Sequence, residues 1–342
     1  MKALVLTPDR SLELTDRPDP SCTGPDDVVV RVVQTGICGT DRGILLGKFP
    51  AQPGVIMGHE IVGEVVETSH GVTSLKPGDR VIANPTLFCG LCSRCRRGQL
   101  NFCLNKSKNE IGIDRDGGFA EYLLLEQAFL HLIPDDMSYD RAVLVEPVAC
   151  VLNNLQAVEL RAEDAVAILG GGPIGAVAAL IANRLGGQVW LQEIDPVRRE
   201  RLTSFFEGIP GSEVQVGAPG DWPDLCADVV VDTVGNLFTQ ACGLVGDQGR
   251  VVIMGFDERA RSTIKPLEIL QRGLKIIGAG DFNSLIFSDA LHLARRLPLE
   301  GLLTHRFALD DFDKALEAIG VTPEPGASYA GLKIVIEGRT AS

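Results

Sequence analysis

Residues 165–175 read AVAILGGGPIG, an apolar run followed at once by a turn rich in glycine. Gly170, Gly172 and Gly175 fit the pattern G-x-G-x-x-G, in which the first glycine allows a tight turn off a strand. The second glycine lets the backbone approach a pyrophosphate, and the third lets helix and strand pack closely. Pro173-Ile174 would open a helix whose free N–H groups face the phosphates. The stretch predicts a dinucleotide site; the alternative is an ordinary strand-to-helix turn.

An acidic residue, Glu193, follows the turn by about 20 residues, at the end of the next predicted strand. Its carboxylate can accept hydrogen bonds from both ribose hydroxyls of NAD, whereas NADP carries a phosphate there. Arg198 and Arg199 oppose this preference because they bring positive charge nearby. We therefore expect NAD to be preferred over NADP, unless Glu193 is only a solvated surface residue.

Strand and helix patterns alternate beyond this turn. A small-residue helix is expected at 173–185, and strands are expected at 165–170, 189–193, 228–235, 249–255 and 274–280. Parallel strands joined by helices form right-handed βαβ units, which predicts a doubly wound parallel sheet of the Rossmann type.

The first part of the chain has a different pattern, with short β-branched runs at 28–33 and 61–66 and a turn leading into a strand at 76–81. We expect a mostly β, partly barrel-like domain. A helical pattern begins near Tyr139 and continues toward Glu159. The C-terminal part carries a helix at 289–296, a segment at 312–319 and a strand at 332–337.

A chain of 342 residues is long for a single core and natural for two domains. We therefore expect two domains.

Charge and hydropathy exclude several classes of partner. The formal net charge of −13 opposes binding to nucleic acid, including by a zinc-ribbon module. No stretch approaches the ~20 apolar residues of a membrane span. The N-terminal residues 1–14 resemble a strand pair rather than a signal peptide, so we expect a cytoplasmic protein with reduced thiols.

Four of the nine cysteines form the run Cys89-x2-Cys92-x2-Cys95-x7-Cys103. Four soft ligands on one short loop can close a tetrahedron around a structural zinc ion. An iron–sulfur cluster is a competing interpretation, but the last spacing is x7 and no proline follows Cys103. A third interpretation is that the four cysteines are buried thiols that bind no metal.

A second set of metal-binding residue types is spread along the chain at Cys38, His59, Glu60 and Glu146. A thiolate, an imidazole and a carboxylate, with a fourth position left for water or substrate, make a catalytic zinc site. Spacing alone leaves room for a small buried cysteine and a structural histidine. We interpret Cys150 as a plain thiol that packs one helical turn after Glu146.

The sequence resembles the zinc-containing medium-chain dehydrogenases of the alcohol dehydrogenase family, in the branch with sorbitol, threonine and polyol dehydrogenases. The similarity covers nearly the whole chain, through residues 36–41, 58–60, 78–81, 89–103, 117–122, 146–147, 170–175 and 333–336. It implies a GroES-like, mostly β catalytic domain formed by residues 1–149 and 287–342, with the structural zinc lobe at 89–103. Beside it, residues 150–286 would form the Rossmann NAD-binding domain. It also implies NAD, two zinc ions per chain, and a homodimer or homotetramer.

The resemblance also implies roles for single residues. Cys38 and His59 would be zinc ligands, and Glu60 a ligand or a neighbouring carboxylate. Glu146 would bind the zinc or hold its water, and Thr40 would take the alcohol proton. Asp41 would orient the site, and Arg198 would lie near the adenosine ribose.

One departure from the family concerns proton transfer. Relatives often have histidine five residues after the zinc-binding cysteine, where this chain has Gly43. The path by which the proton leaves is therefore open.

The expected reaction moves a hydride between a secondary alcohol and NAD, with a small-molecule alcohol or ketone as the partner. The resemblance implies a polyol, sugar, cyclitol or hydroxy-amino acid. Many polyol relatives have histidine where this chain has Asn153. The same replacement is found in dehydrogenases that act on aminocyclitols, so the resemblance includes cyclitols among the possible substrates. The alternative is a non-catalytic NAD(H)-binding or interaction protein on the same fold.

Overall fold

The computed structural model describes residues 1–106, 109–322 and 331–338. One of its two large sheets has six strands in the order β10-β9-β8-β11-β12-β13, all parallel. Those strands are β8 (Val166–Leu169), β9 (Val189–Gln192), β10 (Val214–Gly217), β11 (Ala227–Asp232), β12 (Val245–Ile253) and β13 (Lys275–Ile277). This order, with β8 and β11 adjacent at the centre, confirms the predicted doubly wound fold.

The helices of this part follow from the sequence around them. Between the strands lie α4 (Pro173–Arg184), α5 (Pro196–Glu207), α6 (Phe238–Leu244) and α7 (Pro266–Arg272). Helix α4 buries every residue from Gly175 to Ile181, since small side chains let it approach β8 closely. Helix α5 begins at an N-cap, Asp195, whose carboxylate accepts the backbone N–H of Arg198 at 2.8 Å.

The second sheet has seven strands in the order β14-β15-β3-β4-β5-β7, with β6 pairing on β3. They are β3 (Asp27–Gly36), β4 (Glu60–Thr68), β5 (Arg80–Ala83), β6 (Tyr122–Glu126), β7 (Leu130–Leu132), β14 (Leu303–Ala308) and β15 (Lys333–Glu337). The expected N-terminal strand pair is present as β1 (Lys2–Leu6) and β2 (Leu12–Asp16). Because Val335 of β15 pairs with Gly36 of β3, the C-terminal strands complete the N-terminal sheet. The exact division at 149/150 and 286/287 stays a proposal.

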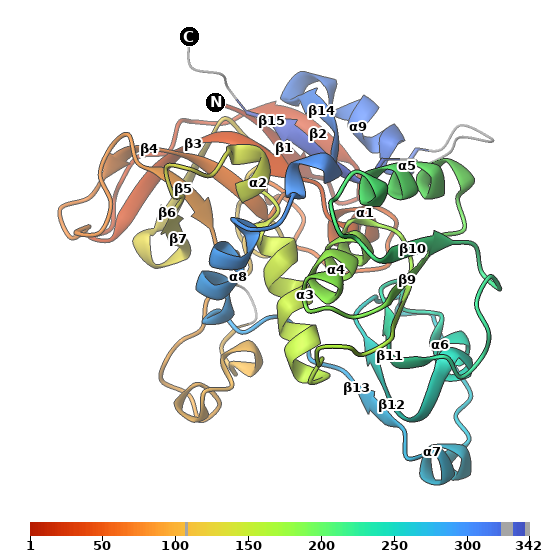
Figure 1. The fold of residues 1–342 in the computed structure, drawn as a ribbon. Coiled ribbons are helices and arrows are strands. Elements are labelled where there is room, and N and C mark those ends of the chain that lie inside the picture. The colour runs from red at the N-terminus through yellow and green to blue at the C-terminus, as the bar shows by residue number, and fades with distance from the viewer. Residues whose placement is uncertain (107–108, 323–330, 339–342) are drawn as a thin grey trace.

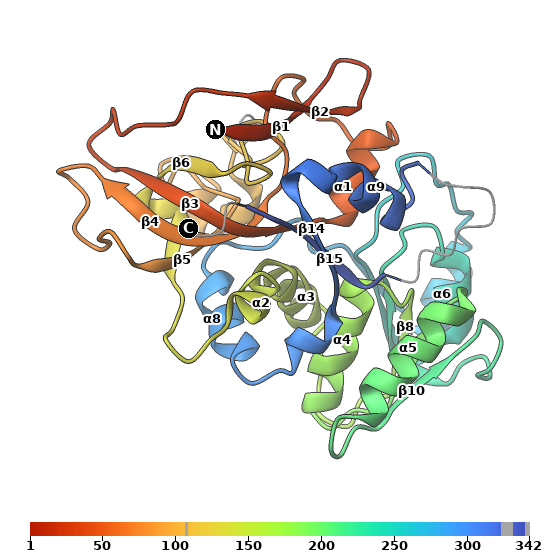
Figure 2. The same ribbon diagram turned by 90° about the horizontal axis from the view of Figure 1, so that it is seen from above.

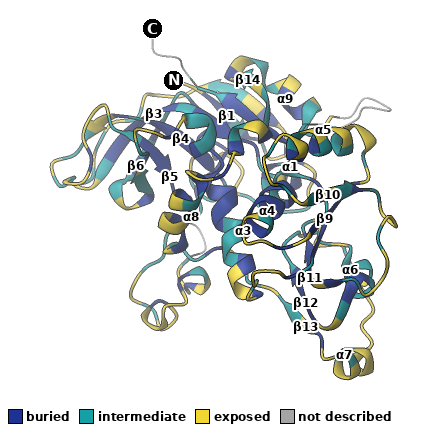
Figure 3. Cartoon of the chain, in the orientation of Figure 1, coloured by how far each residue is buried: buried dark blue, intermediate teal, exposed yellow. Residues whose placement is uncertain are grey.

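Helices fill the space between the two sheets (Figures 1 and 2). Helices α2 (Tyr139–Ala142) and α3 (Val145–Ala157) come from the middle of the chain, and α8 (Ile286–Ala294) packs on α3. Figure 3 shows α3 and α4 largely buried at this position. Helix α8 begins at Ile286 rather than at the expected Asp289, because Ile286 and Phe287 are buried in the same core.

Two short helices flank the second sheet, α1 (Gly39–Leu45) and α9 (Phe312–Ala318). Five 3-10 turns complete the secondary structure of the described ranges: η1 (Cys95–Arg97), η2 (Leu100–Phe102), η3 (Gln127–Phe129), η4 (Leu299–Leu302) and η5 (Leu309–Asp311). Among the described residues, no helix combines the length and the hydropathy that a membrane span requires.

Candidate active site

Cys38 is positioned by the junction between β3 and α1. It is the N-cap residue of α1, and its backbone N–H donates to the Asp41 carboxylate at 2.8 Å. Asp41 is almost fully buried, so its hydrogen bond to Cys38 holds the turn between β3 and α1 in place. Just before it, Gly36 leaves room for Glu60, since a Cβ there would lie 1.9 Å from a Glu60 carboxylate oxygen.

Cys38, His59 and Glu60 come together at the start of β4. Their ligand atoms all lie within 4.8 Å of one another. His59 Nδ1 is buried, lies 3.6 Å from Asp41 Oδ1, and has no hydrogen-bond partner within the described ranges. A half-buried thiol beside a buried imidazole and a buried carboxylate at this spacing fits a metal ion. The geometry therefore accommodates the expected catalytic zinc.

A residue that the sequence reasoning missed lies beside this set. Lys333 of β15 forms an ion pair with Glu60, and both side chains are only 1% exposed. The Lys333 ammonium also donates to the Ile37 carbonyl at 3.0 Å. A lysine inside the apolar run Leu332–Ile336 is a signal that could have identified it, because buried lysines are rare unless paired.

Glu146 occupies the first turn of α3 and is buried, but its carboxylate is not part of the three-residue set. Burial is the main factor that raises the pKa of Glu146 to about 7. Cys150 donates to Glu146 Oε1 at 3.5 Å. The interpretation of Cys150 as a plain packing thiol was therefore incomplete, since one helical turn brings its sulfur against the Glu146 carboxylate.

The expected proton acceptor, Thr40, has its Oγ1 3.6 Å from Cys38 Sγ and is half-buried. Gly43, where relatives often have histidine, faces two aromatic rings. A Cβ on Gly43 would lie 3.4 Å from Phe256 and 3.6 Å from Phe49. The ring centroids of Phe49 and Phe256 are 5.1 Å apart. The surroundings of position 43 are thus apolar on this side.

The four cysteines of the lobe at 89–103 converge on one point. The Sγ–Sγ distances are 3.5 Å for Cys92–Cys95 and 4.0 Å for both Cys89–Cys95 and Cys92–Cys103. Zinc–sulfur bonds of ~2.3 Å at tetrahedral angles place the sulfurs ~3.8 Å apart. Backbone N–H groups, chiefly that of Cys95, lower the pKa of Cys92 to about 6, which favours a thiolate. The donor set fits one zinc ion.

A cleft of 790 Å³ runs between the two sheets and joins both sets of predicted site residues. Cys38, Glu60 and Lys333 line it from one side, and Gly170, Gly172, Pro173 and Ile174 line it from the other. A Cβ on Gly172 would meet no other atom within 4 Å, so a phosphate has room to approach. A Cβ on Gly175 would lie 1.9 Å from the Gly170 carbonyl, which requires glycine there.

Glu193 lies at the far end of the same cleft and is 4% exposed. Its Oε2 accepts the Gly171 N–H at 3.0 Å and pairs with the Arg198 guanidinium at 3.1 Å. Arg199 instead donates to the backbone carbonyls of Glu193 and Ile194. The positive charge of Arg198 is thus already balanced by Glu193.

Comparisons with known proteins agree with this geometry. Residues 24–135 match the family described as "Alcohol dehydrogenase GroES-like domain". The chain is 30% identical to a sorbitol dehydrogenase of Halalkalibacterium halodurans, over 93% of this chain and 96% of the relative. It is also 30% identical to a D-arabitol-phosphate dehydrogenase of Enterococcus avium, over 85% and 87%. A zinc-binding dehydrogenase from Sinorhizobium meliloti, solved with NADP, is similar over 98% of both chains, with a TM-score of 0.86 and 30% identity.

Proposed function

Because the chain belongs to the zinc-dependent medium-chain dehydrogenases of the alcohol dehydrogenase family, we propose that it transfers a hydride between a secondary alcohol and NAD. The observation that carries the proposal is the shared cleft. Cys38 and Glu60 of the ligand set line the same space as Gly170 and Gly172 of the glycine turn. Hydride transfer requires this juxtaposition of substrate and dinucleotide sites.

When bound, zinc polarises the substrate oxygen and NAD accepts the hydride. The residues of the chain supply position and proton transfer. Thr40 takes the hydroxyl proton at Oγ1, and Asp41 orients the turn that carries Cys38. The N-terminus of α4 holds the pyrophosphate through its free N–H groups. Lys333 balances the buried charge of Glu60.

We assign one zinc ion to the mixed set, which consists of Cys38, His59 and Glu60, and one to the four-cysteine lobe. The lobe has little apolar core of its own, since Leu100 is its main buried residue besides Cys95 and Cys103. Metal binding therefore contributes directly to the stability of the lobe. A protein that only binds NAD(H) would need neither the mixed ligand set nor Thr40. We therefore favour an enzyme over a non-catalytic NAD(H)-binding protein.

The substrate class we propose is a polyol, sugar, cyclitol or hydroxy-amino acid. Support comes from the relatives, which are named for sorbitol, arabitol phosphate and threonine. The test is a panel of secondary alcohols from these classes, scored by NADH absorbance with the metal-loaded protein. NADH formation with at least one class supports the proposal, and no response across the panel refutes it.

Two further expectations concern the assembly and the compartment. We propose a homodimer or homotetramer, because β13 is an edge strand and the neighbouring α7 exposes Leu267 and Leu270 by 62% and 76%. Light scattering that finds only monomer at micromolar concentration would contradict this. Cysteines that bind zinc must stay reduced, which favours the reducing cytoplasm as the compartment.

A further inference from the structure

The cleft between the two sheets reaches the C-terminal ends of β9 and β11. Gln192 comes directly before Glu193 on β9, and both line the cleft. Leu237 and Gln240 line it from the start of α6, which packs on β11 (Figure 1). The nicotinamide must lie by the metal ligands for hydride transfer, so the adenosine lies at the Glu193 end of the cleft. The side chains around Glu193 are therefore placed to contact the adenine base.

The turn between β11 and α6 is held in place by Asp232, which is completely buried. Its Oδ1 accepts the backbone N–H groups of Val234 and Gly235, both at 2.9 Å. Its Oδ2 accepts the N–H of Leu237 at 3.2 Å. Because Leu237 is the N-cap residue of α6, these bonds also fix the position of Gln240 in the first turn of this helix.

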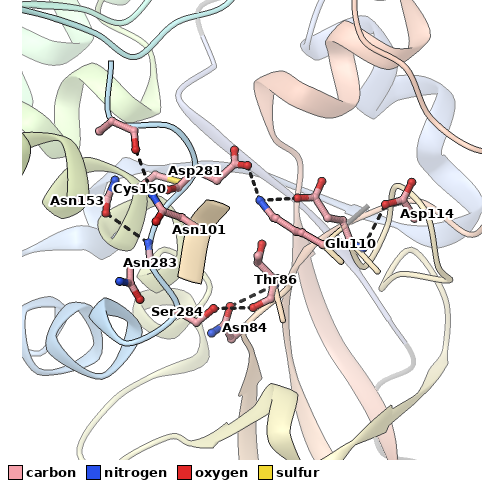
Figure 4. A network of polar contacts seen from close by, with 12 residues as sticks. Asn84, Thr86, Asn101, Glu110, Asp114, Cys150, Asn153, Asp281, Asn283 and Ser284 are labelled. Carbon is pink, nitrogen blue, oxygen red and sulfur yellow. Dashed lines mark hydrogen bonds and ion pairs between the residues drawn. The ribbon is translucent and has the colours of Figure 1, made fainter. Parts of the chain in front are cut away.

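The side chain of Gln240 is joined to that of Gln192. Gln240 Nε2 donates to Gln192 Oε1 at 2.7 Å. Gln192 is 4% exposed, and within the described ranges its own Nε2 has no hydrogen-bond partner. The buried amide of Asn84, in contrast, accepts the Thr86 N–H at 3.2 Å within a larger polar network (Figure 4). Since burial of an amide is costly unless it is paired, the hold on Gln240 is the evident use of Gln192.

This hydrogen bond determines which atom Gln240 offers to a ligand. Its Nε2 is engaged, and in the part of the chain that the structure describes its Oε1 accepts no hydrogen bond and is not buried. Gln240 is half-buried and lines the cleft. An amide oxygen accepts a hydrogen bond from the 6-amino group of adenine, whereas it repels the 6-oxo group of hypoxanthine.

We propose that Gln240, held in place by Gln192, selects the coenzyme by its base. Gln240 Oε1 accepts a hydrogen bond from the adenine 6-amino group, and Gln192 is a positioning residue that acts through Gln240. The chain therefore discriminates against a nicotinamide dinucleotide whose base carries oxygen at position 6. This inference rests on the proposed function, because it concerns the coenzyme of that reaction.

The test compares NADH with the analogue that contains hypoxanthine in place of adenine. Dissociation constants are measured by the fluorescence of the reduced nicotinamide, which requires neither substrate nor turnover. The wild type is expected to bind NADH at least ~10-fold more tightly, because the analogue loses a hydrogen bond and sets one oxygen against another. With the oxidised dinucleotides, the same preference should appear in KM and leave kcat unchanged.

Substitutions at the two glutamines separate contact from positioning. Gln240→Leu should bring the ratio of the two dissociation constants close to one. Gln240→Glu should keep the preference for NADH, because a carboxylate also accepts from an amino group and repels an oxo group. Gln192→Leu should lower the ratio without abolishing binding, since Gln240 remains but is no longer held.

Two other glutamines serve as matched controls and should leave the ratio unchanged. Gln127→Leu is the control for Gln240→Leu, because Gln127 is also half-buried but lies in η3 and does not line the cleft. Gln34→Leu is the control for Gln192→Leu, because Gln34 is 3% exposed and lies in β3 of the other sheet.

Equal dissociation constants for the two reduced dinucleotides in the wild type overturn the inference and leave the proposed function intact. A preference that Gln240→Leu does not change has the same meaning. If the metal-loaded protein binds neither dinucleotide and no secondary alcohol yields NADH, both the inference and the proposed function are refuted.

Discussion

The ammonium of Lys333 is paired with the carboxylate of Glu60, and both side chains are only 1% exposed. The two residues lie far apart in the sequence, on β15 and β4, and meet because both strands flank β3. A buried charge that loses its partner is costly, whereas an intact pair is close to neutral. The ion pair therefore links strand β15 to Glu60, one of the three proposed metal ligands.

Replacement of Lys333 by methionine should lower the free energy of unfolding by about 3–5 kcal/mol, because the Glu60 carboxylate is left buried without a counter-charge. Urea denaturation of the metal-free protein measures this. Lys314→Met is the matched control, since Lys314 pairs with Asp311 on an exposed surface and should change stability by less than about 1 kcal/mol. Equal effects of the two variants would mean that the Lys333–Glu60 pair has no special role.

The two groups of cysteines should respond differently to substitution. Cys38→Ser should abolish turnover but leave NADH binding intact, because the glycine turn lies on the other side of the cleft. Cys92→Ser should mainly lower the thermal midpoint, since the lobe loses a metal that holds it together. Cys226→Ser, a thiol outside both sets, serves as the control. Full activity of Cys38→Ser would refute its place in the catalytic set.

Much of this arrangement could be predicted from local patterns. The strand, glycine turn and helix around Gly170 form a contiguous signal, and the four cysteines lie within one short segment. Lys333 and the contact of Cys150 with Glu146 could not be predicted in this way. The first depends on strand order, and the second on which face of α3 turns toward the site. The apolar contact of Phe49 with Phe256 beside Gly43 likewise joins segments that are distant in the sequence.

Proton transfer is tested at Thr40. Thr40→Ala should reduce kcat by at least ~100-fold, the usual scale for a positioned proton acceptor, whereas Thr40→Ser should retain most of the rate. An unaltered rate in Thr40→Ala would exclude its role.

A histidine at position 43 tests where the proton leaves. Gly43→His should change the pH dependence of kcat, because it places an imidazole, which titrates near neutral pH, at the position where relatives often have the relay histidine. Gly43→Ala adds bulk without a titrating group and should leave the shape of the profile unchanged. Identical profiles for the histidine and alanine variants would show that this position plays no part.

The coenzyme preference is tested at Glu193. Two like charges ~4 Å apart repel by ~4 kcal/mol at an effective dielectric constant of ~20, which we halve for salt and partial exposure. A difference of about 2 kcal/mol changes a binding or rate constant by more than tenfold. We therefore expect kcat/KM to be at least ~10-fold higher with NAD than with NADP.

Glu193→Ala should narrow that preference, because it also releases Arg198 from its ion pair and leaves that positive charge to the phosphate of NADP. Adding Arg198→Ala to Glu193→Ala should restore part of the preference for NAD over NADP. Glu200→Ala, on the exposed face of the same helix, is the control. Equal turnover with NADP in the wild type would mean that the arginines govern the pocket.

Metal analysis during mild chelation shows whether this chain is a zinc enzyme with one catalytic and one structural ion. We predict two zinc ions per chain in the active protein. One ion should leave first, together with the activity and without loss of the circular dichroism of the fold, since the mixed set opens into the cleft and the four-cysteine set is closed. Iron in place of zinc, or full activity in protein that contains no metal, would contradict it.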